Sequence, residues 1–105
     1  LKGKIVYGKG TIVGEVFVYE PGGKFTQIKG KKIFVFRHFA PVHIQFLKKA
    51  KAIITEGGGL LSHAAIVCRE AKIPCLVDVA GATRVLQSGQ SITVDFNQGF
   101  VKIKD

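Results

Sequence analysis

The sequence predicts an α/β domain, because strand-like and helix-like patterns follow one another along its 105 residues. The first forty residues contain alternating or dense apolar runs separated by glycines, as in strands joined by tight turns. Two later segments repeat their apolar residues at three- and four-residue steps, which is typical of helices lying on a core. A chain of this length can form one domain with its own core.

The composition is that of an ordinary globular chain, with 47% hydrophobic and 22% charged residues. No apolar run approaches the roughly 18 residues of a membrane-spanning helix, and no secretory signal is visible, so we expect a cytoplasmic protein with no membrane partner. The chain starts at Leu1 and has no methionine. We therefore expect residues 1–105 to form a single domain cut from a longer polypeptide.

The formal net charge of +9 has more than one interpretation. A basic domain can bind nucleic acid, and the eight phenylalanines could supply stacking groups. The lysines, however, are scattered and fall mainly at segment ends, where solvated lysine is expected. This distribution disfavours nucleic acid as a partner. The excess charge could instead attract phosphorylated substrates or an acidic partner domain.

Two strands are predicted before residue 40. The run Thr11–Glu20 alternates in part, which predicts a half-buried strand, and a Pro-Gly-Gly-Lys turn at 21–24 ends it. The run Lys31–Phe39 is denser in apolar residues, so we expect a strand covered on both faces. Phe34 and Phe36 share one face of it and are predicted to pack in the core.

A helix is predicted next, because the apolar residues recur at helical steps at Phe39, Val42, Phe46 and Ala50. His38 ends the preceding strand and His43 lies off the apolar stripe, so we assign each a surface or packing role. A short strand over 51–55 follows.

The second helix-like pattern consists of Ala64, Val67, Cys68 and Ala71. Ser62 is a good candidate for its N-cap, which makes His63 the first helical residue. Cys68 and Cys75 are spaced too widely for a C-x-x-C pair or a zinc knuckle, and we expect two buried packing residues. A buried strand over 72–79, a short helix over 81–89 and a hairpin over 90–103 complete the domain.

The candidate chemistry lies just before the second helix, where three glycines (57–59) precede Ser62 and His63. Glycines can adopt positive φ angles and let backbone amides approach an anion. A helix N-terminus adds unpaired N–H groups and the positive end of the helix dipole. The stretch therefore predicts a phosphate-binding loop, although it has neither the spacing of a Walker loop nor that of a nucleophile elbow.

His63 places an imidazole at this loop. Neutral imidazole is nucleophilic near neutral pH and can accept a phosphoryl group on a ring nitrogen. The loop amides and the Ser62 hydroxyl would stabilise the charge on the transferred oxygens. Alternatively, a strand-to-helix turn simply requires glycine and serine, and His63 is a solvated first-turn residue. The chemistry of the residues alone leaves both interpretations open.

The segment from Glu56 to Val77 resembles the signature of the phosphohistidine, or swivelling, domain of phosphoenolpyruvate-utilising enzymes. The family pattern of Gly-Gly, Ser-His, a small-apolar helix, Arg-Glu and Ile-Pro is met by Gly58, Gly59, Ser62, His63, Ala64, Ala65, Arg69, Glu70, Ile73 and Pro74. The likeness continues through residues 81–101 and back to the N-terminal strands, so it covers nearly the whole chain. The family includes enzyme I of the sugar phosphotransferase system, and the chain is most similar to phosphoenolpyruvate synthase and pyruvate phosphate dikinase.

The resemblance implies a three-layer β/β/α domain in which His63 carries a phosphoryl group between a nucleotide-binding domain and a phosphoenolpyruvate/pyruvate-binding domain of a parent enzyme. Gly58, Gly59 and Ser62 would bind the phosphate. Thr55, Glu56 and Arg69 would support the loop. The domain itself would bind no cofactor and no metal, and ATP and Mg²⁺ would be bound by other domains of the parent. Alone, it would carry phosphate without turnover.

Two positions depart from the family pattern. Leu61 stands where many members have threonine, and Cys68 stands where alanine is usual. A non-enzymatic regulatory or scaffolding module that keeps this fold is the main alternative function, followed by a basic RNA-binding domain. The final phosphoryl acceptor is not encoded here, because acceptor choice would reside in other domains.

Overall fold

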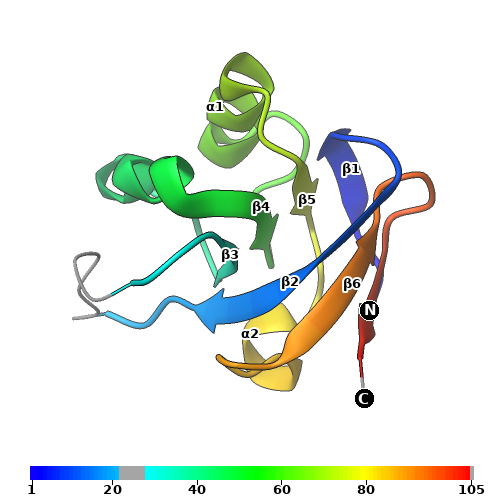
Figure 1. The fold of residues 1–105 in the computed structure, drawn as a ribbon. Coiled ribbons are helices and arrows are strands. Elements are labelled where there is room, and N and C mark those ends of the chain that lie inside the picture. Colours follow the sequence, from blue (N-terminus) through cyan, green and yellow to red (C-terminus); the bar gives the residue numbers. More distant parts are fainter. Residues whose placement is uncertain (22–27, 105) are drawn as a thin grey trace.

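Seven strands form a mixed sheet in the order β1-β5-β4-β3-β2-β6-β7 in the computed structural model, which describes residues 1–21 and 28–104 (Figure 1). In chain order the elements are β1 (Lys4–Tyr7), β2 (Thr11–Val18), β3 (Lys32–Phe36), the 3₁₀ helix η2 (Pro41–Lys49), β4 (Ala50–Thr55), α1 (His63–Ala71), β5 (Cys75–Val77), α2 (Ala82–Val85), β6 (Ser91–Asp95) and β7 (Phe100–Ile103). β2, β3, β4 and β5 pair in parallel, and the other pairings are antiparallel.

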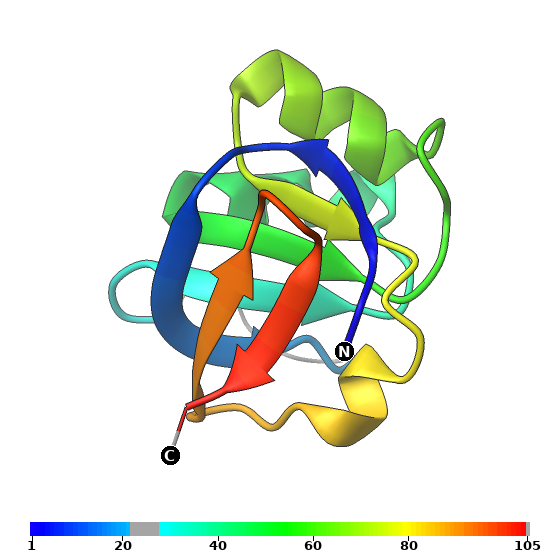
Figure 2. The same cartoon turned by 90° about the vertical axis from the view of Figure 1, so that its right-hand side faces the viewer.

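Strand β2 passes from one layer of the sheet to another. Its residues 11–15 pair with β6, whereas residues 16–18 pair with β3. β6 and β7 therefore form an outer layer that lies in front of the rest in Figure 2, and β1, β5, β4 and β3 form the middle layer. Helices α1 and η2 make the third layer (Figure 1). This arrangement confirms the predicted three-layer β/β/α fold.

Two apolar cores separate the three layers. The sheet core lies between the two β layers, and the helix core lies between the middle layer and the helices. Strand β3 contributes Ile33 and Val35 to the sheet core and Phe34 and Phe36 to the helix core. The prediction that this strand is covered on both faces is thus confirmed, because alternate side chains of a strand point to opposite faces.

Strand β2 is half-buried over residues 11–16, as its alternation predicts, and differs from that prediction only at its end. Val16 lies in the sheet core, while Phe17 and Tyr19 pack against the helix core. The end of the strand is covered on both sides because β2 enters the middle layer there. The predicted turn at 21–24 lies outside the described residues apart from Pro21.

The first predicted helix is present but is a 3₁₀ helix, η2. Val42, assigned to the apolar stripe, is 71% exposed, while His43 is buried together with Phe46. With about three residues per turn, side chains three positions apart lie on the same face, so His43 takes the inward position. Of the two roles considered for His43, packing is the one observed.

The remaining elements occur where the sequence predicts them, but β5 covers only Cys75–Val77 of the strand predicted over 72–79, because Lys72 still caps α1. Helix α1 starts at His63, and Cys68 and Cys75 are both buried. Helix α2 is shorter than expected, because Leu86 already has extended backbone angles. β6 and β7 form the predicted hairpin. Within the described part of the chain, no helix combines the length and the apolar character needed to cross a membrane.

Candidate functional site

The candidate site is built where three parallel strands end. β3, β4 and β5 are neighbours in the middle layer, and their carboxyl ends meet at one edge. Arg37 and His38 follow β3, Glu56 and the glycine loop follow β4, and Asp78 follows β5. Loops at the carboxyl ends of parallel strands are the usual ligand-binding positions of α/β sheets.

The glycine loop uses left-handed backbone at two of its three glycines. Gly58 has a φ of 102° and Gly59 a φ of 68°, whereas Gly57 does not have a positive φ. A Cβ atom on Gly58 would also lie 2.8 Å from the Cβ of Ser62. The hydroxyl of buried Thr55 donates to the Gly57 carbonyl at 2.8 Å, so Thr55 orders the start of the loop. These observations explain the glycines at 58 and 59 by backbone conformation.

Ser62 caps helix α1, as predicted. Its Oγ accepts a hydrogen bond from the Ala65 amide at 3.2 Å, and its own amide donates to the Gly59 carbonyl at 3.3 Å. One orphan donor of the first helical turn is therefore satisfied without His63. The serine hydroxyl proton is still available as a donor, because a hydroxyl can donate and accept at once.

His63 lies at the start of α1 with a half-buried ring. The ring stacks on Phe39, with 5.9 Å between the ring centroids and 27° between the planes. Its Nε2 atom is buried and has no hydrogen-bond partner among the described residues. A buried polar atom without a partner costs about 1–3 kcal/mol, and such atoms are rare in native proteins. The imidazole is at the predicted place, but this nitrogen is shielded from solvent.

Asp78 lies at the loop and was not anticipated from the sequence. Its Oδ1 accepts a hydrogen bond from the Gly59 amide at 3.0 Å, and the ammonium group of Lys4 is 3.5 Å from Oδ2. Asp78 itself has a φ of 57°. The amide that we predicted to bind phosphate thus donates to a carboxylate here. The signal available in the sequence was its position directly after a strand parallel to β4, which brings Asp78 to the same sheet edge as Glu56.

Glu56 ties the loop to helix α2. Its Oε2 accepts hydrogen bonds from the amide and the hydroxyl of Thr83, at 2.7 and 2.5 Å. Its Oε1 is 3.6 Å from the Arg37 guanidinium. The Thr83 hydroxyl is the main cause that holds the pKa of Glu56 below its ordinary value, and the Thr83 amide and Arg37 act in the same direction. Glu56 therefore has a supporting position, with partners that sequence analysis did not identify.

Arg69 contacts the backbone of the loop. Its exposed guanidinium reaches back along α1 and donates to the Leu60 carbonyl at 2.7 Å. Leu61, next in the chain, is 88% exposed. The position of Arg69 is compatible with the supporting role predicted for it.

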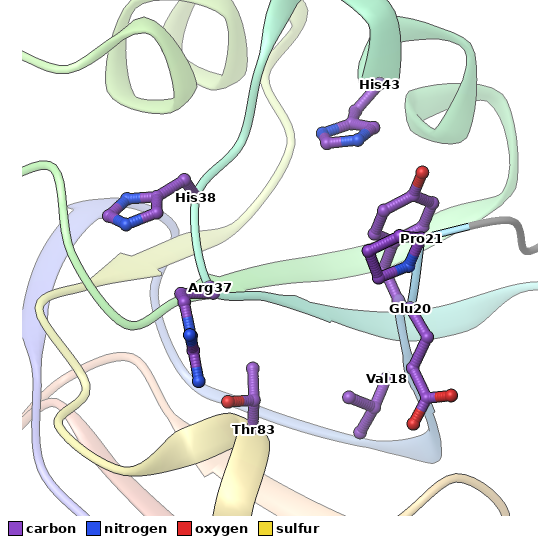
Figure 3. A pocket seen from close by; sticks show the side chains of 8 residues that line it. Val18, Glu20, Pro21, Arg37, His38, His43 and Thr83 are labelled. Carbon is purple, nitrogen blue, oxygen red and sulfur yellow. The ribbon is translucent and has the colours of Figure 1, made fainter.

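A cavity of about 620 Å³ lies beside the loop and is lined by Tyr19, Arg37, His38, His43 and Thr83, among others, but not by His63 (Figure 3). The Arg37 side chain runs from the end of β3 toward Thr83 (Figure 3), and both contact Glu56. His43 Nδ1 accepts from the Ala40 amide at 3.0 Å, and burial lowers the pKa of His43. In residues 1–21 and 28–104, no cluster of three or more potential metal ligands is present.

Comparison with known proteins gives the family. Residues 28–99 match the family described as "PEP-utilising enzyme, mobile domain". A probable phosphoenolpyruvate synthase of Staphylothermus marinus is 41% identical over 95 residues, which cover 90% of this chain and 11% of the relative. The chain therefore spans about a tenth of the length of this relative.

Two solved structures share the fold. The solution structure of an enzyme I protein has a TM-score of 0.63 and 24% identity, and covers 74% of this chain and 32% of its own. Holo aconitase X of Thermococcus kodakaraensis has a TM-score of 0.69 and 23% identity. The match covers 99% of this chain and 97% of the aconitase X chain. At these identities the similarity establishes architecture alone. By the family match and the identity to its relative, this chain belongs to the mobile-domain family of PEP-utilising enzymes.

Proposed function

We propose that this domain carries a phosphoryl group on His63 for a phosphotransferase of the phosphoenolpyruvate synthase kind. One observation supports the proposal most: His63 is the first residue of α1, a few residues after the left-handed glycines 58 and 59, and Ser62 caps the helix. The Nε2 atom of the imidazole has no hydrogen bond within the described residues to give up when it reacts. Membership of a PEP-utilising family makes phosphoryl transfer the chemistry that fits such a nucleophile.

The proposed reaction has two balanced halves. In the first, the lone pair of a neutral imidazole nitrogen attacks the phosphorus of a phosphoanhydride. The N–P bond forms as the P–O bond breaks, and the electron pair leaves with the donor oxygen. In the second, an acceptor oxygen attacks the phosphorus and the N–P electron pair returns to the ring. The Ser62 hydroxyl and the amides near the start of α1 would donate to the transferred oxygens.

The donor and acceptor sites belong, in this proposal, to other domains. We assign ATP with its Mg²⁺ to a nucleotide-binding domain and the acceptor to a phosphoenolpyruvate/pyruvate-binding domain, since this chain spans only 11% of its relative. The excess of 16 Lys and Arg over 7 Asp and Glu would favour encounter with acidic or phosphate-bearing surfaces.

The test is a graft in which this chain replaces the 95 matched residues of the Staphylothermus marinus relative. A graft that melts cooperatively is incubated with Mg²⁺ and with ATP labelled at each phosphorus in turn. We expect acid-labile, base-stable label on the graft, lost in His63→Ala and retained in the matched control His38→Ala. A folded graft that takes no label, or one that keeps its label in His63→Ala, would overturn the proposal.

A further inference from the structure

The inference starts from the Nε2 atom of His63, which is buried without a hydrogen-bond partner among the described residues. Phosphorus bonded to a nitrogen needs space for three oxygens, and a nitrogen with no accessible surface has none. The stacked orientation of the ring therefore cannot accept a phosphoryl group on Nε2. A change in the position of the ring has to precede that reaction.

Phe39 is the side chain that the His63 ring stacks on, and it is firmly held. Phe39 is 7% exposed and packs edge-on against Phe36, with 5.1 Å between the centroids. It also contacts the ring of His43 at 5.9 Å. The next residue, Ala40, is anchored through its amide by His43 Nδ1. The helix core thus fixes the Phe39 ring, so the half-buried His63 ring is the one of the two that can move.

We propose that Phe39 is a positioning residue that holds His63 in a shielded resting orientation, and that the imidazole leaves Phe39 before Nε2 is phosphorylated. The proposal deepens the function proposed above and rests on it. Rotation about the Cα–Cβ bond of His63 breaks one stacking contact and lets Nε2 meet solvent or a donor. The helix start survives this rotation, because Ser62 and not His63 caps α1.

The first measurement uses the unaltered chain. Nuclear Overhauser effects between ring protons of His63 and Phe39 are recorded before and after chemical phosphorylation with potassium phosphoramidate, and ¹⁵N-histidine labelling identifies the nitrogen that carries phosphorus. We expect the ring contacts to be present in the unmodified chain and lost when Nε2 of His63 is phosphorylated. Persistence of the contacts in the Nε2 product would overturn the proposal, as would phosphorus on Nδ1 of a His63 that stays stacked.

The second measurement compares variants. Phe39→Leu should raise the initial rate of Nε2 phosphorylation about three- to tenfold, the range expected for loss of one aromatic contact. Phe39→Tyr should restore the original rate. Phe34→Leu is the matched control, because Phe34 is also buried in the helix core and its ring contacts are with Phe17, Phe36 and Phe46. An equal rate in the Phe39→Leu and Phe34→Leu variants would refute the role of Phe39.

The two proposals fail in different ways. A folded graft that takes no label would refute the proposed carrier function, and the results of the stacking measurements would still hold. Stacking that persists in the Nε2 product would refute the proposed role of Phe39, and His63 would still be the proposed carrier.

Discussion

Two helix starts in this domain carry a histidine each, and they use it differently. At the start of η2, His43 is buried and its Nδ1 accepts the Ala40 amide. At the start of α1, Ser62 accepts the Ala65 amide, and the Nε2 of His63 has no partner in the described part of the chain. A histidine that completes the backbone hydrogen bonding of its own helix has a structural role. A histidine relieved of capping by a neighbouring serine is available for chemistry.

Contact with Phe39 does not account for this difference. Both rings contact Phe39, at a centroid distance of 5.9 Å in each case. The contrast therefore arises from hydrogen bonding at the helix start and from depth of burial. Each of the following predictions tests one part of that contrast.

The largest expected effect is that of His63→Ala on phosphoryl transfer. Labelling of the graft should be abolished, while the free energy of unfolding of the chain changes by less than about 1 kcal/mol, because the substitution removes a buried nitrogen that has no hydrogen-bond partner among the described residues. Labelling assays and urea denaturation measure the two quantities. Loss of more than about 3 kcal/mol would show that His63 is structural instead.

His43→Ala should lower the stability of the chain but leave phosphoryl transfer intact. We expect it to lower the free energy of unfolding by about 2–4 kcal/mol, because it leaves a cavity among aromatic rings and takes away the acceptor of the Ala40 amide. Labelling should persist at temperatures where the variant is folded. The exposed His38 provides the control, since His38→Ala should change stability by no more than about 0.5 kcal/mol. A fully stable His43→Ala variant would contradict the structural assignment.

The pH dependence of stability should also distinguish His43. Burial lowers its pKa in the folded chain below the ordinary value of 6.5, so the unfolded chain binds more protons just below pH 6.5. The stability is fully present above that pH and decreases as the pH falls through the folded-state pKa. For one titrating group, the free energy of unfolding changes by at most about 1.4 kcal/mol per pH unit.

Urea denaturation at closely spaced pH values between 7.5 and 5 checks this expectation. The decrease should be absent in the His43→Ala variant, and equal slopes in the two proteins would refute it. Glu56 contributes a separate decrease at lower pH, below its ordinary value of 4.5, because its folded-state pKa is also lowered.

Substitutions of Ser62 should have the smallest effects on stability and labelling. Ser62→Ala should lower the free energy of unfolding by about 1 kcal/mol through loss of the N-cap. Ser62→Asp should keep the stability, because aspartate is an equally good N-cap, but it should slow labelling by placing a negative charge where the phosphoryl oxygens arrive. Equal labelling rates in the Ser62→Asp variant and the unaltered chain would show that Ser62 does not face the transferred group.

Features that depend on a few neighbouring residues were predictable from the sequence. The start of α1 at His63, its cap by Ser62 and the positive φ angles at Gly58 and Gly59 all follow from local chemistry. The two-sided burial of β3 follows from its dense apolar run. The layer arrangement required the family resemblance, because periodicity alone does not order strands.

Other features depend on long-range contacts or small differences in period. The helical prediction assumes 3.6 residues per turn, whereas η2 has about 3.0, and this change of period is the reason that His43 instead of Val42 lies inside. The bond from Thr83 to Glu56 joins residues 27 positions apart, and that from Gly59 to Asp78 joins residues 19 apart. Nothing near Phe39 in the sequence indicates its contact with His63.

The most direct test of the account is to locate the phosphorus. The graft, labelled with ATP and Mg²⁺, is digested at alkaline pH and the fragments are sequenced by mass spectrometry. The account predicts phosphate on the fragment that contains His63 and none on the fragments that contain His38 or His43. Phosphate on either of those two histidines, with His63 unmodified, would contradict it.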